Sequence, residues 1–270
     1  MAFENTYRRA ARTNIAPWSD RISALVQRER KTRFSGGRLG ALWAYITPVS
    51  WVFLVVLFYR FTGRTAPLDA GLEIFVAVGF LPYIIFRQTI TSRARGSVSN
   101  RAMLVIRGVR VGDLLTASAV QELINSLILM TVIFTAISLV YGSRPPADIG
   151  RVIEAIACAW LLGVGVGRMF AILALMSDAM LRMIPIILRP TFWISGIFYT
   201  AHELLGPIYD VLSWSPMLHA TEILREGYFL GYQSPLSDGL FVLVSGLVPY
   251  VISFPLEMIL VRRDVSRYRS

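Results

Sequence analysis

The chain has 270 residues, of which 55% are apolar and only 16% are charged, and its mean hydropathy is +0.57. Soluble domains carry about a quarter charged residues, so this composition excludes a soluble globular protein and indicates a membrane protein. A single cysteine, Cys158, excludes an internal disulfide, and two histidines exclude a metal site built from several histidines. The net charge of +10 comes almost entirely from arginine, because Lys31 is the only lysine.

Six stretches are candidate transmembrane helices at about 20 apolar residues per span. They cover residues 42–61, 72–86, 114–141, 149–176, 183–199 and 240–261. The second and fifth are short or interrupted, with Pro82 in one and Pro185 and Pro190 in the other, which is compatible with kinks or partial spans. We therefore predict an all-α integral membrane protein with six transmembrane helices. Residues 42–261 form its membrane domain, between a segment 1–41 and a tail 262–270.

The basic residues gather in three segments, which predicts the orientation of the chain. Residues 1–41 hold nine Arg or Lys, residues 87–113 hold six and residues 262–270 hold four, together 19 of the 27. The connection 200–238 has a single basic residue, Arg225, against five acidic ones. The positive-inside rule then places both termini and the loop 87–113 in the cytoplasm and the connection 200–238 outside. Six spans satisfy this placement.

An amphipathic helix is predicted before the first span. Between residues 18 and 34 the apolar residues Trp18, Ile22, Leu25 and Val26 recur at helical spacing, while basic residues occupy the other faces. This pattern predicts a helix that lies on the inner membrane surface. An ordinary solvated basic helix that steadies the topology is the alternative. Ser35, Gly36 and Gly37 end the helix at a sharp corner.

The loop 87–113 contains a second unusual segment, from residue 99 to residue 109. Ser99 or Asn100 is a suitable cap for the start of a short helix there. Four consecutive apolar residues follow: Met103, Leu104, Val105 and Ile106. Such a patch needs a partner surface or the bilayer interface, unless the loop packs on itself, and the sequence leaves both readings open.

The chain lacks the residues of a nucleotide-binding site. A phosphate-binding loop needs a glycine-framed segment that ends in lysine and Ser or Thr, and no glycine frames the only candidate, Lys31 followed by Thr32. If ATP powers this protein, another chain must bind it. His219, Glu222 and Glu226 fall at helical spacing, but a polar helix face is favoured over a metal site because only His202 remains to complete it.

Two charged residues are expected inside the membrane. Glu122 and Arg168 lie about nine residues from the cytoplasmic ends of the third and fourth spans, so antiparallel spans bring them to a similar depth. We predict a Glu122–Arg168 ion pair, with a substrate or proton path as the alternative role. Gly163 and Gly167 have the spacing that allows two membrane helices to approach closely.

Aromatic residues are abundant around the first span and again from residue 193 to residue 232. Belts at the membrane interface explain most of them. Aromatic faces also stack on sugar rings, and the sequence alone does not separate these two uses.

The order of these parts resembles the permease subunits of ABC exporters for surface polysaccharides, most closely the capsular polysaccharide type. The matching N-terminal pieces are Arg28-Glu29-Arg30-Lys31-Thr32-Arg33-Phe34 and Gly36-Gly37-Arg38-Leu39-Gly40-Ala41-Leu42-Trp43. The loop matches at Ser99-Asn100-Arg101 through Leu104, and at Arg107, Val109 and Asp113. Similar outer pieces are Ser195-Gly196-Ile197-Phe198-Tyr199, Ser215-Pro216-Met217-Leu218-His219-Ala220 and Glu226-Gly227-Tyr228. The resemblance covers nearly the whole chain, and it rests on the order of these motifs because each motif alone has little specificity. The chain departs from it at Leu205-Gly206, where a proline is expected sooner.

The resemblance implies a homodimeric permease of the bacterial inner membrane, joined to two ATP-binding subunits that hold ATP and magnesium. It implies that the surface helix gates the entry of a lipid-linked polysaccharide and that short re-entrant helices follow the fifth span, within 200–238. It implies that the loop 87–113 couples to the ATPase, for which we expect Asn100, Met103, Leu104, Val105, Ile106 and Arg107.

For the substrate we expect Arg30, Lys31, Arg33 and Arg38 to hold an anionic lipid head, because guanidinium groups fork onto phosphate oxygens. Positive-inside orientation explains these four charges equally well. Trp43 and Tyr59 are the expected aromatic substrate contacts. We expect no catalytic residue, metal, cofactor or nucleic-acid partner for this chain, and membrane lipid around it. The alternatives are an exporter of O-antigen, teichoic acid or drugs, a polytopic membrane transferase, and a structural membrane anchor.

Overall fold

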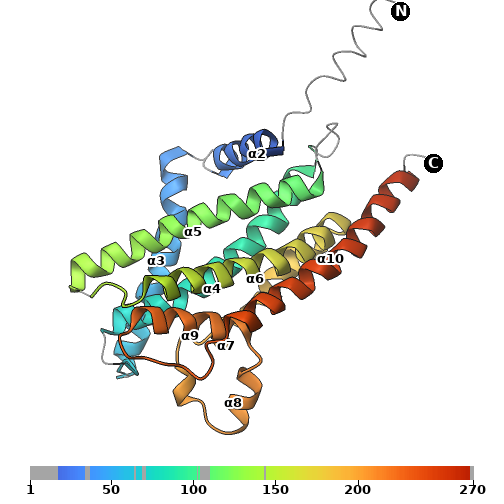
Figure 1. Cartoon of the computed structure of the whole chain (residues 1–270). Coiled ribbons are helices and arrows are strands. Elements are labelled where there is room, and N and C mark those ends of the chain that lie inside the picture. The colour runs from blue at the N-terminus through green and yellow to red at the C-terminus, as the bar shows by residue number, and fades with distance from the viewer. Residues whose placement is uncertain are drawn as a thin grey trace, which may run out of the picture.

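The computed structural model describes residues 18–33, 37–63, 65–68, 71–101, 103, 110–142 and 144–267, and within these it contains helices and no strand. The helices are shown in Figure 1. They are α2 (Trp18–Arg33), α3 (Gly37–Phe61), α4 (Leu72–Ser99), α5 (Val111–Tyr141), α6 (Ile149–Met176), α7 (Ala179–Ile194), η2 (Ala201–Glu203), α8 (Pro207–Leu212), α9 (Pro216–Tyr228) and α10 (Gly239–Arg267). The predicted all-helical class is confirmed.

Within the described residues, four helices are long and apolar enough to cross a membrane: α4, α5, α6 and the part Gly239–Leu260 of α10. A shorter apolar stretch, Ile46–Phe61, lies in α3. Helix α7 has 16 residues with Pro185 and Pro190 inside, as expected for a short and interrupted segment. The bounds of α6 coincide with the predicted span 149–176.

Helix α4 is longer than predicted. We placed residues 87–99 in a cytoplasmic loop and expected Ser99 or Asn100 to start a new helix, but α4 runs to Ser99 and Asn100 caps its C-terminus. Thr89, Arg93 and Ser97 explain the difference, because they recur every four residues and are buried. The polar face that they form packs on α6, where the Ser97 hydroxyl donates to the Ala171 carbonyl at 3.4 Å.

Helix α6 packs between α4 and α10, and glycines allow the close contact. A Cβ added at Gly163 would lie 2.8 Å from the Cβ of Thr89 on α4. A Cβ added at Gly165 would lie 1.8 Å from the carbonyl oxygen of Gly246 on α10. The predicted close helix approach at this glycine stripe is confirmed, and both neighbours lie within the same chain.

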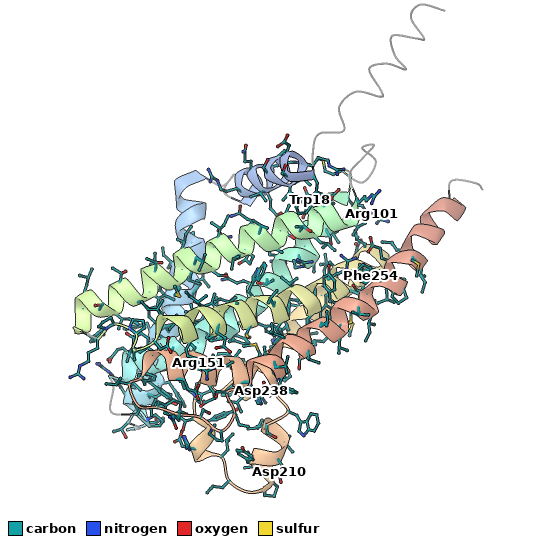
Figure 2. The ribbon with its side chains drawn as sticks, viewed as in Figure 1. Trp18, Arg101, Arg151, Asp210, Asp238 and Phe254 are labelled. Atoms are coloured by element: carbon teal, nitrogen blue, oxygen red, sulfur yellow. The ribbon has the colours of Figure 1, made fainter. Side chains whose placement is uncertain are left out.

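The two ends of the bundle carry different structures. Helix α2 packs on α5 near the end of the bundle at which α10 finishes, whereas α8 and α9 lie at the opposite end (Figure 1). Trp18, Arg101 and Phe254 lie toward the first end, and Arg151, Asp210 and Asp238 toward the second (Figure 2).

Candidate functional site

An aromatic cavity of about 570 Å³ lies between α3, α4 and α7. Its lining residues are Trp51, Leu54, Val55, Phe58, Phe80, Tyr83, Arg87, Pro185, Leu188, Arg189, Phe192, Trp193 and Phe198. Seven of these thirteen side chains are aromatic and none is acidic. The cavity therefore presents aromatic ring faces and positive charge between three apolar helices.

Phe192 on α7 organises the aromatic wall. Its ring lies edge-on to Trp51 of α3 at 6.3 Å between centroids, and to Tyr83 of α4 and Phe198 at 5.3 Å each. Trp193 stacks on Phe198 at 5.2 Å and is 65% exposed, so one face of its indole stays open. Edge-on aromatic pairs hold their rings in fixed directions, which makes this wall a preformed surface.

Arg87 on α4 and Arg189 on α7 are the charged residues of the cavity, and both are exposed. Within the described part of the chain, neither forms an ion pair with a carboxylate. An arginine at the centre of a membrane helix costs about 2.5–3.5 kcal/mol on insertion scales, so such residues normally face water or a partner. Sequence reasoning missed both residues: Arg189 lies inside the predicted fifth span, which was a signal for it, whereas Arg87 directly follows the predicted second span and was assigned to the loop 87–113.

The predicted substrate residues Tyr59 and Trp43 are placed differently from each other. Tyr59 is 1% exposed, and its hydroxyl donates to the Phe198 carbonyl at 2.5 Å while its ring stacks on Phe198. Tyr59 therefore supports the wall of the aromatic cavity from behind. Trp43 is 64% exposed near the start of α3 and is not among the residues that line the cavity.

Helix α2 has the predicted apolar stripe, but protein covers part of it. Leu25 is buried in a cluster with Leu114 and Ala117 of α5, and Val26 packs on the same cluster. We expected the stripe to lie on the inner membrane surface, and for Leu25 this is wrong because α5 provides the apolar partner. Trp18, which is 56% exposed, remains available to the interface.

Of the predicted anion-binding residues, the side chain of Arg30 is exposed near the end of α2. The side chains of Lys31, Arg33 and Arg38 lie outside the described residues. Their grouping around a lipid head therefore stays a prediction.

The predicted coupling residues are partly described. Asn100 caps α4, and its side-chain amide donates to the Gly96 carbonyl at 2.9 Å. Met103 packs on the cluster that Leu25 of α2 forms with α5. Leu104, Val105, Ile106 and Arg107 lie outside the described residues. The start of this loop therefore contacts the same cluster as α2.

Arg168 has a different carboxylate partner from the one predicted. Its guanidinium pairs with Glu257 of α10 at 2.5 Å and donates to the Ser253 hydroxyl at 2.8 Å, over the rings of Tyr250 and Phe254. We paired it with Glu122 because consecutive spans are antiparallel, but α6 packs mainly on α4 and α10. The sequence offered one signal for this partner, because the carboxylate Glu257 lies inside the last predicted span.

Helix α9 is anchored by a buried ion pair. Arg225 and Glu222 are both fully buried and 2.5 Å apart, and Arg225 also donates to the carbonyls of Tyr199 and Gly196. The Tyr232 hydroxyl donates to Glu222, and burial, followed by the charge of Glu222, raises the pKa of that hydroxyl. These contacts fix α9 in the bundle.

The polar face of α9 holds separate interactions. His219 accepts from the Asp238 amide and its other ring nitrogen meets the Ser213 carbonyl, so its ring nitrogens are both occupied. Glu226 accepts from the Ser234 amide. Among the described residues, no three His, Cys, Asp or Glu side chains form a metal-binding group.

These features define a class: an all-helical membrane protein with a preformed aromatic and basic cavity between its apolar helices. Residues 20–229 match the family model described as ABC-2 type transporter. Because this match covers most of the chain, the protein belongs to the ABC-2 transporter membrane family.

Two capsule-related relatives are similar over most of their length, and a third relative is similar over less than half. The polysialic acid transport protein KpsM of Escherichia coli is 29% identical over 219 residues, which cover 79% of this chain and 83% of KpsM. The capsule polysaccharide export inner-membrane protein CtrC of Neisseria meningitidis serogroup B is 27% identical over 223 residues, 79% of this chain and 82% of CtrC. The O-antigen export system permease protein RfbA of Myxococcus xanthus is 28% identical over 124 residues, 46% of each chain.

Proposed function

We propose that this protein is the inner-membrane permease subunit of an ATP-driven exporter of lipid-linked capsular polysaccharide. The observation that carries the proposal is the similarity to capsule export relatives, which extends over about four-fifths of this chain. The aromatic cavity supports it, because ring faces are suited to sugar rings. The shorter similarity to RfbA makes O-antigen export the second candidate.

In this proposal α3 and α7 complete a set of six spans with α4, α5, α6 and α10. Both termini face the cytoplasm, because 19 of the 27 basic residues lie in the segments 1–41, 87–113 and 262–270, whereas the connection 200–238 has one basic and five acidic residues. Arg101 and Asp210, from these two groups, lie toward opposite ends of the bundle (Figure 2). Helices α8 and α9 are the re-entrant segment on the outer side. A cysteine introduced at Asp210 in a Cys158-free chain should react with an impermeant thiol reagent in intact cells, and one at Arg101 should not; the reverse pattern contradicts this orientation.

The exporter is proposed to contain two copies of this chain and two ATP-binding subunits. Leu54 and Phe58 of α3 and Trp193 of α7 line the aromatic cavity and are exposed, so a second copy would cover apolar surface and close the cavity into a channel. The ATP and magnesium belong to the partner subunits, because no glycine-framed loop precedes Lys31, the only lysine of this chain. Membrane lipid surrounds the remaining apolar surface, and no nucleic acid takes part.

The proposed path begins at α2, where Arg30, Lys31, Arg33 and Arg38 receive the anionic head of the lipid-linked substrate. It continues past Trp43 and along the aromatic cavity, and ends beside the outer segment 200–238. The loop that starts at Asn100 transmits the movement of the ATPase, because Met103 packs on the cluster shared by α2 and α5.

Deletion of the gene tests the proposal. A deletion strain should lose its surface capsular polysaccharide and accumulate the polymer inside the cell, and the wild-type chain should restore it. Loss of O-antigen with an intact capsule would favour the second candidate. Normal amounts of both surface polymers would refute an export function of either kind.

A further inference from the structure

The aromatic cavity contains two arginines that the export function alone does not explain. Arg87 projects from α4 and Arg189 from α7 into one cavity, so two different helices bring positive charge to one place. Both side chains are exposed, and none of the residues that line the cavity is acidic. A neutral polymer would require the ring faces but neither charge.

Both arginines stand on helices and not on connecting segments. Arg87 lies inside α4 (Leu72–Ser99) and directly follows an apolar stretch that ends at Phe86, and Arg189 lies inside α7 (Ala179–Ile194). An anion bound by both residues would therefore lie against the aromatic walls of the cavity that these helices form.

The neighbours of the two arginines indicate the rest of that molecule. Trp51, Phe58 and Trp193 line the same cavity and are each at least 43% exposed. Guanidinium groups bind carboxylate and phosphate oxygens in a forked geometry, and planar rings stack on flat apolar faces such as those of sugars. Charge and ring faces in one cavity match a sugar residue that carries an acidic group.

We propose that Arg87 and Arg189 form an anion-binding site that holds the acidic groups of the glycan in the aromatic cavity and so favours acidic over neutral polysaccharides. This inference rests on the proposed export function. It assigns the recognition of the glycan to α4 and α7, apart from the arginines beside α2 that are expected to receive the lipid head.

Binding to the full-length chain in phosphatidylcholine nanodiscs tests the site. The probes are oligosialic acid and a neutral maltooligosaccharide of the same length, and the change in tryptophan fluorescence, to which Trp51 and Trp193 in the cavity contribute, reports their binding. Oligosialic acid should bind more tightly. Arg87→Gln and Arg189→Gln should each weaken it at least about tenfold, because each removes a charge-assisted contact, and change maltooligosaccharide binding less than about twofold.

Two further variants separate charge from folding. Arg95 is exposed on the same helix and does not line the cavity, so Arg95→Gln should bind oligosialic acid like the wild type. Arg87→Lys keeps the positive charge and should retain most of the binding that Arg87→Gln loses. Equal losses in Arg87→Gln and Arg95→Gln, or in Arg87→Lys and Arg87→Gln, would overturn the site.

The remaining outcomes distinguish this site from the export function. If the wild type exports capsule but binds the acidic and the neutral probe equally, the anion site is refuted and export stands. If phosphatidylglycerol in the nanodisc abolishes oligosialic acid binding, the arginines bind lipid and the glycan site is also refuted. If deletion of the gene leaves all surface polymers unchanged, the export function itself fails.

Discussion

Replacing Arg225 should destabilise the protein more than any other single loss of charge that the structure describes. Arg225→Met keeps the length of the side chain but removes its ion pair with Glu222 and its bonds to the carbonyls of Tyr199 and Gly196. Glu222 would remain as a fully buried carboxylate that accepts a hydrogen bond from the Tyr232 hydroxyl. Breaking a buried pair on one side costs about 3–5 kcal/mol.

A matched control is available at the surface of the same region. Arg151 pairs with Glu154 and Glu226, but its side chain is 40% exposed, and exposed pairs contribute about 0–1 kcal/mol. The assay is thermal unfolding of the purified variants in detergent, followed by tryptophan fluorescence. Arg225→Met should lower Tm by on the order of 10 °C and Arg151→Met by a few degrees at most.

The double variant Arg225→Met with Glu222→Gln tests the cause. It removes both charges, so it should regain part of the stability that Arg225→Met loses, as a coupled pair requires. The reasoning is refuted if Arg225→Met unfolds within a few degrees of Arg151→Met, or if Glu222→Gln adds a further full loss instead of a recovery.

Three other predictions concern packing, coupling and substrate entry. Gly165→Ala should lower the free energy of unfolding by about 1–3 kcal/mol, because the added Cβ would lie 1.8 Å from the Gly246 carbonyl oxygen. Unchanged thermal unfolding would contradict the close contact between α6 and α10. Leu104→Asp should weaken copurification of the ATP-binding subunit and reduce export, since a charge in a desolvated contact costs about 2–5 kcal/mol; normal copurification and export exclude the coupling role. Arg33→Gln with Arg38→Gln should reduce substrate-stimulated ATP hydrolysis but spare basal hydrolysis, because each lost contact weakens the binding free energy of the lipid head by about 1.5–3 kcal/mol. Correct membrane insertion of this variant with full export excludes lipid-head binding.

The parts of the fold that local patterns determine were predictable. The predicted fourth span coincides with α6, because a long apolar run is enough to define a membrane helix. The stripe of α2 and the glycines of α6 were also found, because helical spacing is visible in the sequence. In each case the signal lies within one helix.

The parts that depend on which helices pack together were not predictable. Arg168 pairs with Glu257, 89 residues later, because α10 packs on α6. The end of α4 looked like a loop because its polar face meets α6, which hides Thr89, Arg93 and Ser97 from lipid. Spacing along one helix does not give the neighbour that covers each face.

The candidate site shows the same division. The sequence indicated aromatic residues in two regions but not that α3, α4 and α7 bring them around one cavity with Arg87 and Arg189. It suggested Tyr59 as a substrate contact, whereas the structure buries its ring behind Phe198. Exposure is a tertiary property, so the side chains that face the cavity required the structure.

Transport in a purified system tests the central claim most directly. The chain and its ATP-binding partner are reconstituted in vesicles with the ATP-binding side outward, and lipid-linked capsular polysaccharide is supplied on that side. ATP should carry the polymer into the lumen, where an added glycosidase no longer digests it, and vesicles with a partner that cannot hydrolyse ATP should leave it accessible. Protection that is equal with and without ATP hydrolysis, or no protection at all, would contradict an ATP-driven export function.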